Sequence, residues 1–204
     1  MKLLLTGFEP FGGSDVNPSA QIVARLAGEG GVGGALVTAV LPVDRYRGPA
    51  TLIQVVQQSE PDAVLCLGLA GQRPAIAIER VAVNLLDFRI ADNNGNQFVD
   101  EPIVPDGPAA YFTTLPVRAM HEAALAAGVP AELSLSAGTF LCNQVTYELL
   151  HYLAANQLNI QAGFVHVPYL PEQVAQKRPL LPSMSLATMC QGITAVIQAI
   201  CSAN

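Results

Sequence analysis

Several features are scarce in this sequence of 204 residues. Charged side chains make up only 13% of it, and the ten lysine and arginine residues are scattered without forming a cluster. No apolar run approaches the roughly 18 residues of a membrane span. Since the formal net charge is −6, the sequence predicts neither a nucleic-acid partner nor a membrane partner.

Paired cysteines are missing as well. Four cysteines are present without C-x-x-C spacing or a compact disulfide framework: Cys66, Cys142, Cys190 and Cys201. This pattern favours free thiols in a reducing cytoplasm and gives no support for a zinc site. The N-terminal MKLLLTGFEPFGG contains a three-leucine run that is too short for a secretory signal and is interpreted as a first strand. A cytoplasmic location is therefore expected.

Hydrophobic residues, by contrast, make up 51% of the chain. The length suits one domain with a substantial core, so a single domain over residues 1–204 is expected. So large an apolar fraction exceeds what a small monomer of this size needs to bury. The surplus favours self-association.

Strand and helix patterns alternate along the chain. Strands are expected at 2–6, 35–42, 62–67, 75–86, 132–136 and 161–169, and helices at 18–27, 47–59, 116–127, after Cys142, and at 185–202. The continuous apolar run at 62–67 is typical of a central parallel strand. The order predicts an α/β fold: a single-domain α/β/α sandwich with a mostly parallel twisted central sheet. The long polar stretch at 87–108 is expected to be a functional loop or a small hairpin excursion.

One cysteine stands at a predicted junction of strand, turn and helix. In AELSLSAGTFLCNQVTYELLHYL, a strand and a small turn precede an amphipathic helix that begins near Cys142. Free backbone N–H groups and the helix dipole would lower the pKa of this thiol and favour the thiolate. The same N–H groups could bind an oxyanion. The alternative is an inert core cysteine, which is the interpretation preferred for the other three.

A base for Cys142 can be sought among three histidines. His121 and His151 fall in predicted helices with polar neighbours and are interpreted as exposed or half-exposed. His166 ends the apolar strand GFVHVPY, and in open parallel sheets ligands bind beyond the carboxyl ends of strands. Cys142 and His166 are thus expected at one edge of the sheet. The alternative for His166 is a core histidine satisfied by the backbone.

An imidazole that acts in catalysis usually needs a third group to orient it. Glu79 interrupts the apolar strand AIAIERVAVNLL, where a carboxylate is costly unless it meets a cation or a donor. The adjacent Arg80 should point to the opposite face of the strand. Glu79 is therefore the expected orienting group, and a structural salt bridge to another arginine is the alternative.

The glycine-containing loop TGFEPFGG does not fit a phosphate site. It lacks both the lysine of a P-loop and G-x-G-x-x-G spacing. Its two aromatic rings, Phe8 and Phe11, could flank a small flat ligand or simply fill the edge of the sheet.

Together these segments carry a resemblance to a known family. They follow one another in unbroken order along nearly the whole chain: TGFEPFGG with NPS, GLAGQR leading to ERVAVN, RIADNNGNQ, DEPI, GPAAYFTTLP, SAGTFLCN and HVPYLPEQ. The sequence resembles the pyroglutamyl-peptidase I family, also called pyrrolidone-carboxylate peptidases. The resemblance implies a cytoplasmic cysteine peptidase that removes an N-terminal pyroglutamyl residue from peptides. It also implies an α/β/α fold, commonly a homotetramer, and neither metal nor organic cofactor.

The resemblance also implies roles for individual residues. The implied catalytic set is the nucleophile Cys142, the general base and acid His166 and the orienting Glu79, which are also the residues chosen from the patterns above. The remaining implied roles are oxyanion stabilisation by the Cys142 N–H and Arg89, and substrate binding by Phe8, Phe11 and Asn17. Two residues depart from the family's pattern: Phe88 replaces a small residue, and Gln72 replaces a glycine.

Two other functions are compatible with parts of the pattern. One is a thiol hydrolase that acts on another small amide. The other is a non-catalytic α/β module that binds a nucleoside or sugar and contains an inert thiol. A binding module has no reason to contain Glu79, Cys142 and His166 together, so this set favours the peptidase.

Overall fold

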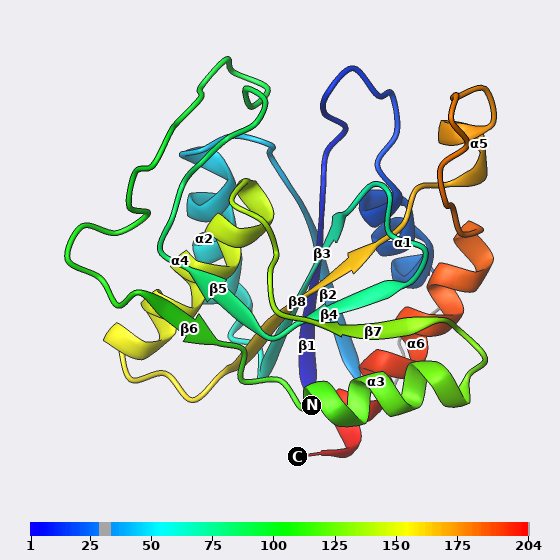
Figure 1. Cartoon of the computed structure of the whole chain (residues 1–204). Helices are drawn as coiled ribbons and strands as arrows, with labels where there is room; N and C mark the ends of the chain where they lie inside the picture. Colours follow the sequence, from blue (N-terminus) through cyan, green and yellow to red (C-terminus); the bar gives the residue numbers. More distant parts are fainter. Residues whose placement is uncertain (29–33, 204) are drawn as a thin grey trace.

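The computed structural model describes residues 1–28 and 34–203. Its centre is a six-stranded sheet with the strand order β2-β1-β3-β8-β4-β7 (Figure 1). The strands are β1 (Lys2–Phe8), β2 (Ala35–Leu41), β3 (Ala63–Leu69), β4 (Ile76–Glu79), β7 (Ala131–Ser134) and β8 (Gln161–Val167). Neighbouring strands are parallel except for β4 and β8, which are antiparallel. The predicted mostly parallel sheet is confirmed.

Helices cover both faces of this sheet (Figure 1). One face packs against α1 (Pro18–Gly28), α3 (Val117–Ala126) and α6 (Leu186–Ser202), and the other against α2 (Arg47–Ser59) and α4 (Leu141–Ala155). A short α5 (Pro171–Val174) follows β8. The predicted α/β/α layering is confirmed. Among residues 1–28 and 34–203, no helix has the length and apolar character needed to cross a membrane.

The apolar runs of the central strands follow from this layering. In β1, Leu3 and Leu5 join the apolar cluster on the α1, α3 and α6 side, whereas Leu4 joins the cluster on the α2 and α4 side. Successive side chains of a strand point to opposite faces, so a strand covered on both sides has to be apolar throughout. After the loop that follows β1, Asn17 caps α1: its Oδ1 accepts hydrogen bonds from the N–H and the hydroxyl of Ser19.

The segment predicted as one strand over 75–86 is divided in two, and that prediction was wrong. The central sheet keeps β4, which ends at Glu79, whereas β5 (Val81–Val83) pairs with β6 (Ala110–Phe112) in a separate two-stranded sheet. Apolar residues resume at Val81, directly after the charged pair Glu79 and Arg80, so the pattern does not reveal that the chain leaves the central sheet there. The strand β6 was not predicted.

The polar stretch over 87–108 doubles back as an irregular hairpin, one of the two forms predicted for it. An isolated antiparallel bridge joins Leu86 to Glu101, and the N–H of Phe88 donates to the carbonyl of Phe98 at 2.8 Å. The ring of Phe88 is buried and packs edge-on against Phe98, with ring centres 5.5 Å apart. This hairpin forms one wall of a cavity at the edge of the central sheet.

Candidate active site

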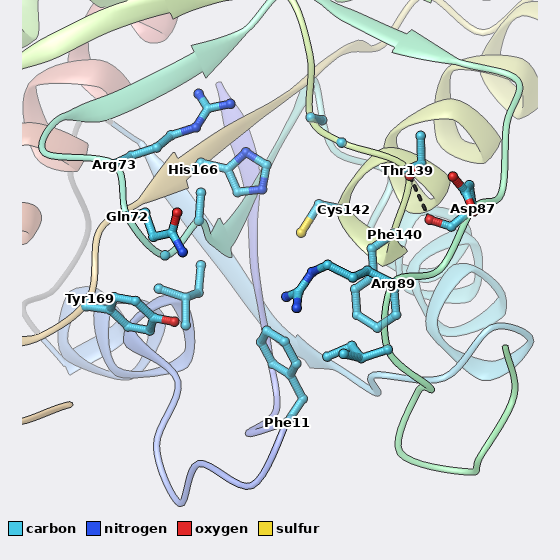
Figure 2. Close-up of a pocket in the computed structure, with 16 residues that line it drawn as sticks. Phe11, Gln72, Arg73, Asp87, Arg89, Thr139, Phe140, Cys142, His166 and Tyr169 are labelled. Atoms are coloured by element: carbon cyan, nitrogen blue, oxygen red, sulfur yellow. Dashed lines mark hydrogen bonds between the residues drawn. The ribbon is translucent and has the colours of Figure 1, made fainter. Parts of the chain in front are cut away.

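A cavity of about 450 Å³ lies at the edge of the sheet where β1, β3 and β8 end (Figure 2). Its wall combines loops that are far apart in the sequence: Phe11 after β1, residues 69–73 after β3, Asp87, Arg89 and Ile90 from the hairpin, residues 137–140 with Cys142, and His166 with Tyr169. The carboxyl ends of parallel strands are the usual place for a ligand in such a sheet. Cys142 and His166, which were expected at one edge of the sheet, both line this cavity.

The thiol of Cys142 lies directly over the sheet. Cys142 is the second residue of α4, which begins at Leu141 after the extended N-cap residue Phe140. A Cβ atom on Gly68 would lie only 2.8 Å from its Sγ and 2.6 Å from the Phe164 ring, so this close approach requires glycine. Gly68 pairs with His166 across β3 and β8, and paired residues of neighbouring strands point to the same face. The sheet therefore brings the thiol and the imidazole together.

The carboxylate of Glu79 reaches His166 from the other side. In the antiparallel pair β4 and β8, Glu79 lies opposite Phe164, two residues before His166, and thus on the same face. Its Oε1 lies 2.8 Å from Nδ1 of His166, and the side chain is 1% exposed. When Nδ1–H donates to this carboxylate, the lone pair of Nε2 is free to accept a proton.

Glu79 also meets an arginine that the sequence patterns did not single out. Nη1 of Arg73 lies 3.3 Å from Oε1 of Glu79. The two alternatives raised for Glu79, an orienting group and a salt bridge, thus occur at the same oxygen. A signal in the sequence could have indicated Arg73. It lies in the loop after β3, at the sheet edge where a cation for the buried carboxylate of Glu79 was to be expected.

The acidity of Cys142 differs from the prediction. Burial, with a further contribution from the Glu79 carboxylate, raises the pKa of this thiol to about 12. The helix terminus was expected to lower it, but loss of hydration is the larger effect here. At neutral pH the thiol of the free protein is therefore protonated. Burial also raises the pKa of Cys66 to about 12, which fits its interpretation as an inert core residue.

The three residues expected to bind substrate do not all reach the cavity. Phe11 lines it, with its ring centre 6.1 Å from that of Phe140. Phe8 is 2% exposed and packs behind the wall against Phe164, at 6.5 Å between ring centres. Asn17 is 1% exposed and caps α1. Phe140 and Tyr169, which were not predicted, supply two further aromatic rings of the cavity wall.

Two polar side chains complete the wall. Arg89 turns its guanidinium into the cavity (Figure 2), and within the described residues it forms no ion pair. Gln72 also lines the cavity, with a left-handed backbone φ of 76° that is unusual for a residue other than glycine. Phe88 lies below the surface and packs edge-on against Phe140 at 4.6 Å between ring centres. The part of the chain that the structure describes contains no group of three or more His, Cys, Asp or Glu suited to a metal ion.

A thiol beside an imidazole that a buried carboxylate orients is the arrangement of cysteine-dependent hydrolases. A family model described as pyroglutamyl peptidase matches residues 1–203. The chain belongs to the pyroglutamyl peptidase family.

Individual relatives of the family are similar to this chain over nearly their whole lengths. The chain is 45% identical over 199 residues to the pyrrolidone-carboxylate peptidase of Vibrio campbellii, covering 98% of this chain and 92% of the relative. It is 48% identical over 208 residues to that of Levilactobacillus brevis, covering 100% and 99%. Among solved structures, pyroglutamyl peptidase I of Bacillus amyloliquefaciens superposes with a TM-score of 0.94 at 41% identity, covering 98% and 97%. A mutant pyrrolidone carboxyl peptidase from the hyperthermophile Pyrococcus furiosus gives 0.95 at 40% identity, covering 100% and 99%.

Proposed function

We propose that this chain is a cysteine peptidase that removes an N-terminal pyroglutamyl residue from peptides. The observation that carries this proposal is that Cys142 and His166 line one cavity while the buried Glu79 contacts Nδ1 of His166. The full-length similarity to pyrrolidone-carboxylate peptidases supports the substrate class.

The reaction begins with proton transfer from Cys142 to Nε2 of His166, because the thiol with its pKa of about 12 is not ionised at neutral pH. Sγ then attacks the pyroglutamyl carbonyl carbon, and its oxygen becomes an oxyanion. The N–H of Cys142 and the guanidinium of Arg89 stabilise that charge. The imidazolium returns its proton to the leaving amine as the C–N bond breaks. Water that His166 deprotonates then attacks the thioester, releasing free pyroglutamate and the thiol.

The cavity suits the neutral end group of the substrate. Pyroglutamate has neither an α-ammonium nor a side-chain carboxylate, so it can enter without burying a charge. The rings of Phe11 and Phe140 are placed to pack against the lactam, while Phe8 and Asn17 support the loop from behind. A second cavity of about 320 Å³ shares Phe11, Leu69, Arg89, Ile90 and Tyr169 with the first. It provides room for the peptide beyond the scissile bond.

Release of a fluorophore from pyroglutamyl, prolyl and glutaminyl amides tests this function. Efficient cleavage of the pyroglutamyl amide alone is expected, and iodoacetamide should abolish it as Cys142 becomes alkylated. A prolyl amide lacks the lactam carbonyl and leaves a donor of the cavity unpaired, which costs about 1–3 kcal/mol. Similar kcat/KM values for the three amides would refute the proposed substrate. Loss of activity in step with alkylation of Cys66, Cys190 or Cys201 would refute the nucleophile.

The two phenylalanines of the first loop test the pocket separately. Phe11→Ala should lower kcat/KM on the pyroglutamyl amide, because the ring positions the lactam. Phe8→Ala should mainly lower the free energy of unfolding, by about 3–5 kcal/mol, because that ring is buried in the core. If both variants kept the wild-type kcat/KM, the aromatic pocket would be wrong.

Assembly and location complete the proposal. We infer that the chain acts in the cytoplasm as a homotetramer. The resemblance to the family and cysteine spacing without a C-x-x-C motif or a compact disulfide framework support this inference, as do the large hydrophobic side chains exposed on the surface.

A further inference from the structure

One guanidinium joins three segments around the cavity. Arg73 lies in the loop between β3 and β4, and its side chain is 28% exposed. Its Nη1 lies 3.3 Å from Oε1 of Glu79 and 3.3 Å from Oε1 of Glu132 on β7. Its Nη2 donates to the carbonyl of Ser136 at 3.0 Å. Arg73 thus connects the end of β4, the strand β7 and the loop that leads to Cys142.

The contact with His166 alone does not compensate the buried carboxylate of Glu79. Both close contacts fall on Oε1, and within the described residues Oε2 is buried without a hydrogen-bond partner. A buried carboxylate is costly unless a cation or donors compensate it. His166 supplies a full positive charge only while it holds the proton of Cys142, whereas an arginine is always charged. In the resting protein, Arg73 is therefore the permanent counter-charge of Glu79.

On the basis of the function proposed above, we propose that Arg73 is a positioning residue for catalysis. Its charge compensates the buried carboxylate of Glu79, so the acceptor that orients Nδ1–H is held in place before the reaction starts. Its second arm fixes the backbone at Ser136, which begins the turn ahead of Cys142. The Arg73 side chain thereby fixes the position of Glu79, which orients His166, relative to the loop that leads to Cys142.

The charge of Arg73 should also be visible in the pH dependence. Each protonated form in the cavity carries one more positive charge than its deprotonated form, so removing a nearby cation moves deprotonation to higher pH. The titratable or charged groups around His166 are Glu79 from β4, Cys142 from α4, Cys66 from β3, and Arg73, Asp87, Arg89 and Tyr169 on the cavity wall, with Glu132 beyond Arg73. Arg73 touches Glu79 directly, so its loss should affect the pair most.

Three variants separate charge from anchoring. Arg73→Gln removes the charge, whereas Arg73→Lys keeps it but cannot form the planar fork that reaches both Glu79 and Ser136. Glu132→Gln is the matched control, because it alters the exposed partner of Arg73 and leaves Glu79 and Ser136 in place. For each protein, kcat/KM on a pyroglutamyl amide and the rate of Cys142 alkylation by iodoacetamide are measured against pH. Alkylation is followed by mass mapping, and thermal unfolding checks the fold.

We expect Arg73→Gln to shift the acidic limb of the kcat/KM profile and of the alkylation profile to higher pH, by about 0.5 to 1 pH unit. Its kcat should fall roughly tenfold or more, because Glu79 and the loop are less well placed. Arg73→Lys should keep the acidic limb of the wild type with a smaller loss of kcat. Glu132→Gln should match the wild type in both profiles.

The proposal is overturned if Arg73→Gln keeps the wild-type limb in both profiles, or if Arg73→Lys shifts it as far as Arg73→Gln does. If Arg73→Gln does not fold, Arg73→Lys decides: a wild-type limb supports the proposal, and a shifted limb overturns it. Alkylation needs no peptide substrate. A wild type that cleaves no pyroglutamyl amide would thus refute the proposed function, while a shifted alkylation profile in Arg73→Gln would still support the role of Arg73.

Discussion

The carboxylate of Glu79 has opposite effects on the two neighbouring groups, the thiol of Cys142 and the imidazole of His166. Burial raises the pKa of the thiol to about 12, and the negative charge of Glu79 adds to that rise. The same negative charge stabilises an imidazolium at His166, 2.8 Å away. The site therefore disfavours a lone thiolate but favours transfer of the thiol proton to His166. Nucleophile and base are expected to act as one unit.

Removing the base should make this coupling measurable. In His166→Ala the thiol of Cys142 keeps its burial but loses its proton acceptor, so alkylation by iodoacetamide should be very slow at pH 7. Because the pKa of the thiol is raised, the rate should climb as the pH increases towards about 12. The rate of Cys142 modification, followed by mass mapping from about pH 6 to about pH 10, checks this. Equal rates for variant and wild type at pH 7 would show that His166 does not activate the thiol.

Replacing the carboxylate tests the third member of the set. Glu79→Gln keeps the shape of the side chain but cannot stabilise the imidazolium, so kcat should fall by about 10²-fold or more. The amide can still occupy the same site, and the fold should be retained. Steady-state kinetics together with circular dichroism measure both effects. An unchanged kcat would return Glu79 to a structural role beside Arg73.

At the level of elements, the site depends on how closely α4 approaches the sheet. Gly68 in β3 leaves no side chain between the strand and Sγ of Cys142, and Phe164 fills the space beside it. A helix that began one residue earlier or later would direct another side chain to this position. The close contact of β3 with the start of α4 therefore fixes where the nucleophile lies.

Gly68→Ala should disturb this contact. The new Cβ would lie 2.8 Å from Sγ of Cys142 and 2.6 Å from Phe164, so the thiol or the ring has to move. Overpacking of this kind costs about 1–3 kcal/mol of stability, and a displaced thiol should lower activity by roughly 10²-fold or more. Gly28→Ala is the matched control, because among the described residues the added Cβ there meets no atom within 4 Å apart from its chain neighbours and the backbone of its own helix. Measuring kcat/KM and the unfolding midpoint for both variants decides the point; normal activity in Gly68→Ala would contradict it.

The elements also show which features a single sequence can predict. Helix α2 was predicted with its bounds Arg47–Ser59, and the helix predicted over 185–202 is α6 (Leu186–Ser202), because helical periodicity is a local signal. The departure of β5 from the central sheet was missed because apolar residues resume at Val81, directly after Glu79 and Arg80. The contact of Arg73 with Glu79 and the position of Phe8 behind the wall depend on tertiary packing, which local patterns do not encode. The raised pKa of Cys142 likewise depends on burial by distant segments.

For the whole molecule, the apolar composition leaves hydrophobic side chains on the surface. Large ones are exposed at Val40, Tyr46, Val99, Phe112, Leu125, Leu135, Leu158 and Leu180. Two of them lie near one another: Tyr46 packs edge-on against Phe98, the neighbour of Val99, at 6.5 Å between ring centres. This patch lies on the start of α2 and on the hairpin whose other residues, Arg89 and Ile90, line the cavity. A partner on the patch would therefore also hold one wall of the cavity.

We expect sedimentation at micromolar concentration to give a mass near four times the 21.4 kDa of one chain. The double variant Tyr46→Ser with Val99→Ser should weaken the assembly, since it removes apolar area that only a partner chain can bury. Its kcat/KM should fall as the protein is diluted, because the hairpin that carries Arg89 loses support. Leu180→Ser serves as the comparison, because Leu180 is somewhat more exposed than Tyr46 and Val99 but lies far along the chain, just before α6. A monomeric wild type would contradict the homotetramer. A double variant that stays tetrameric would place the interface elsewhere on the surface.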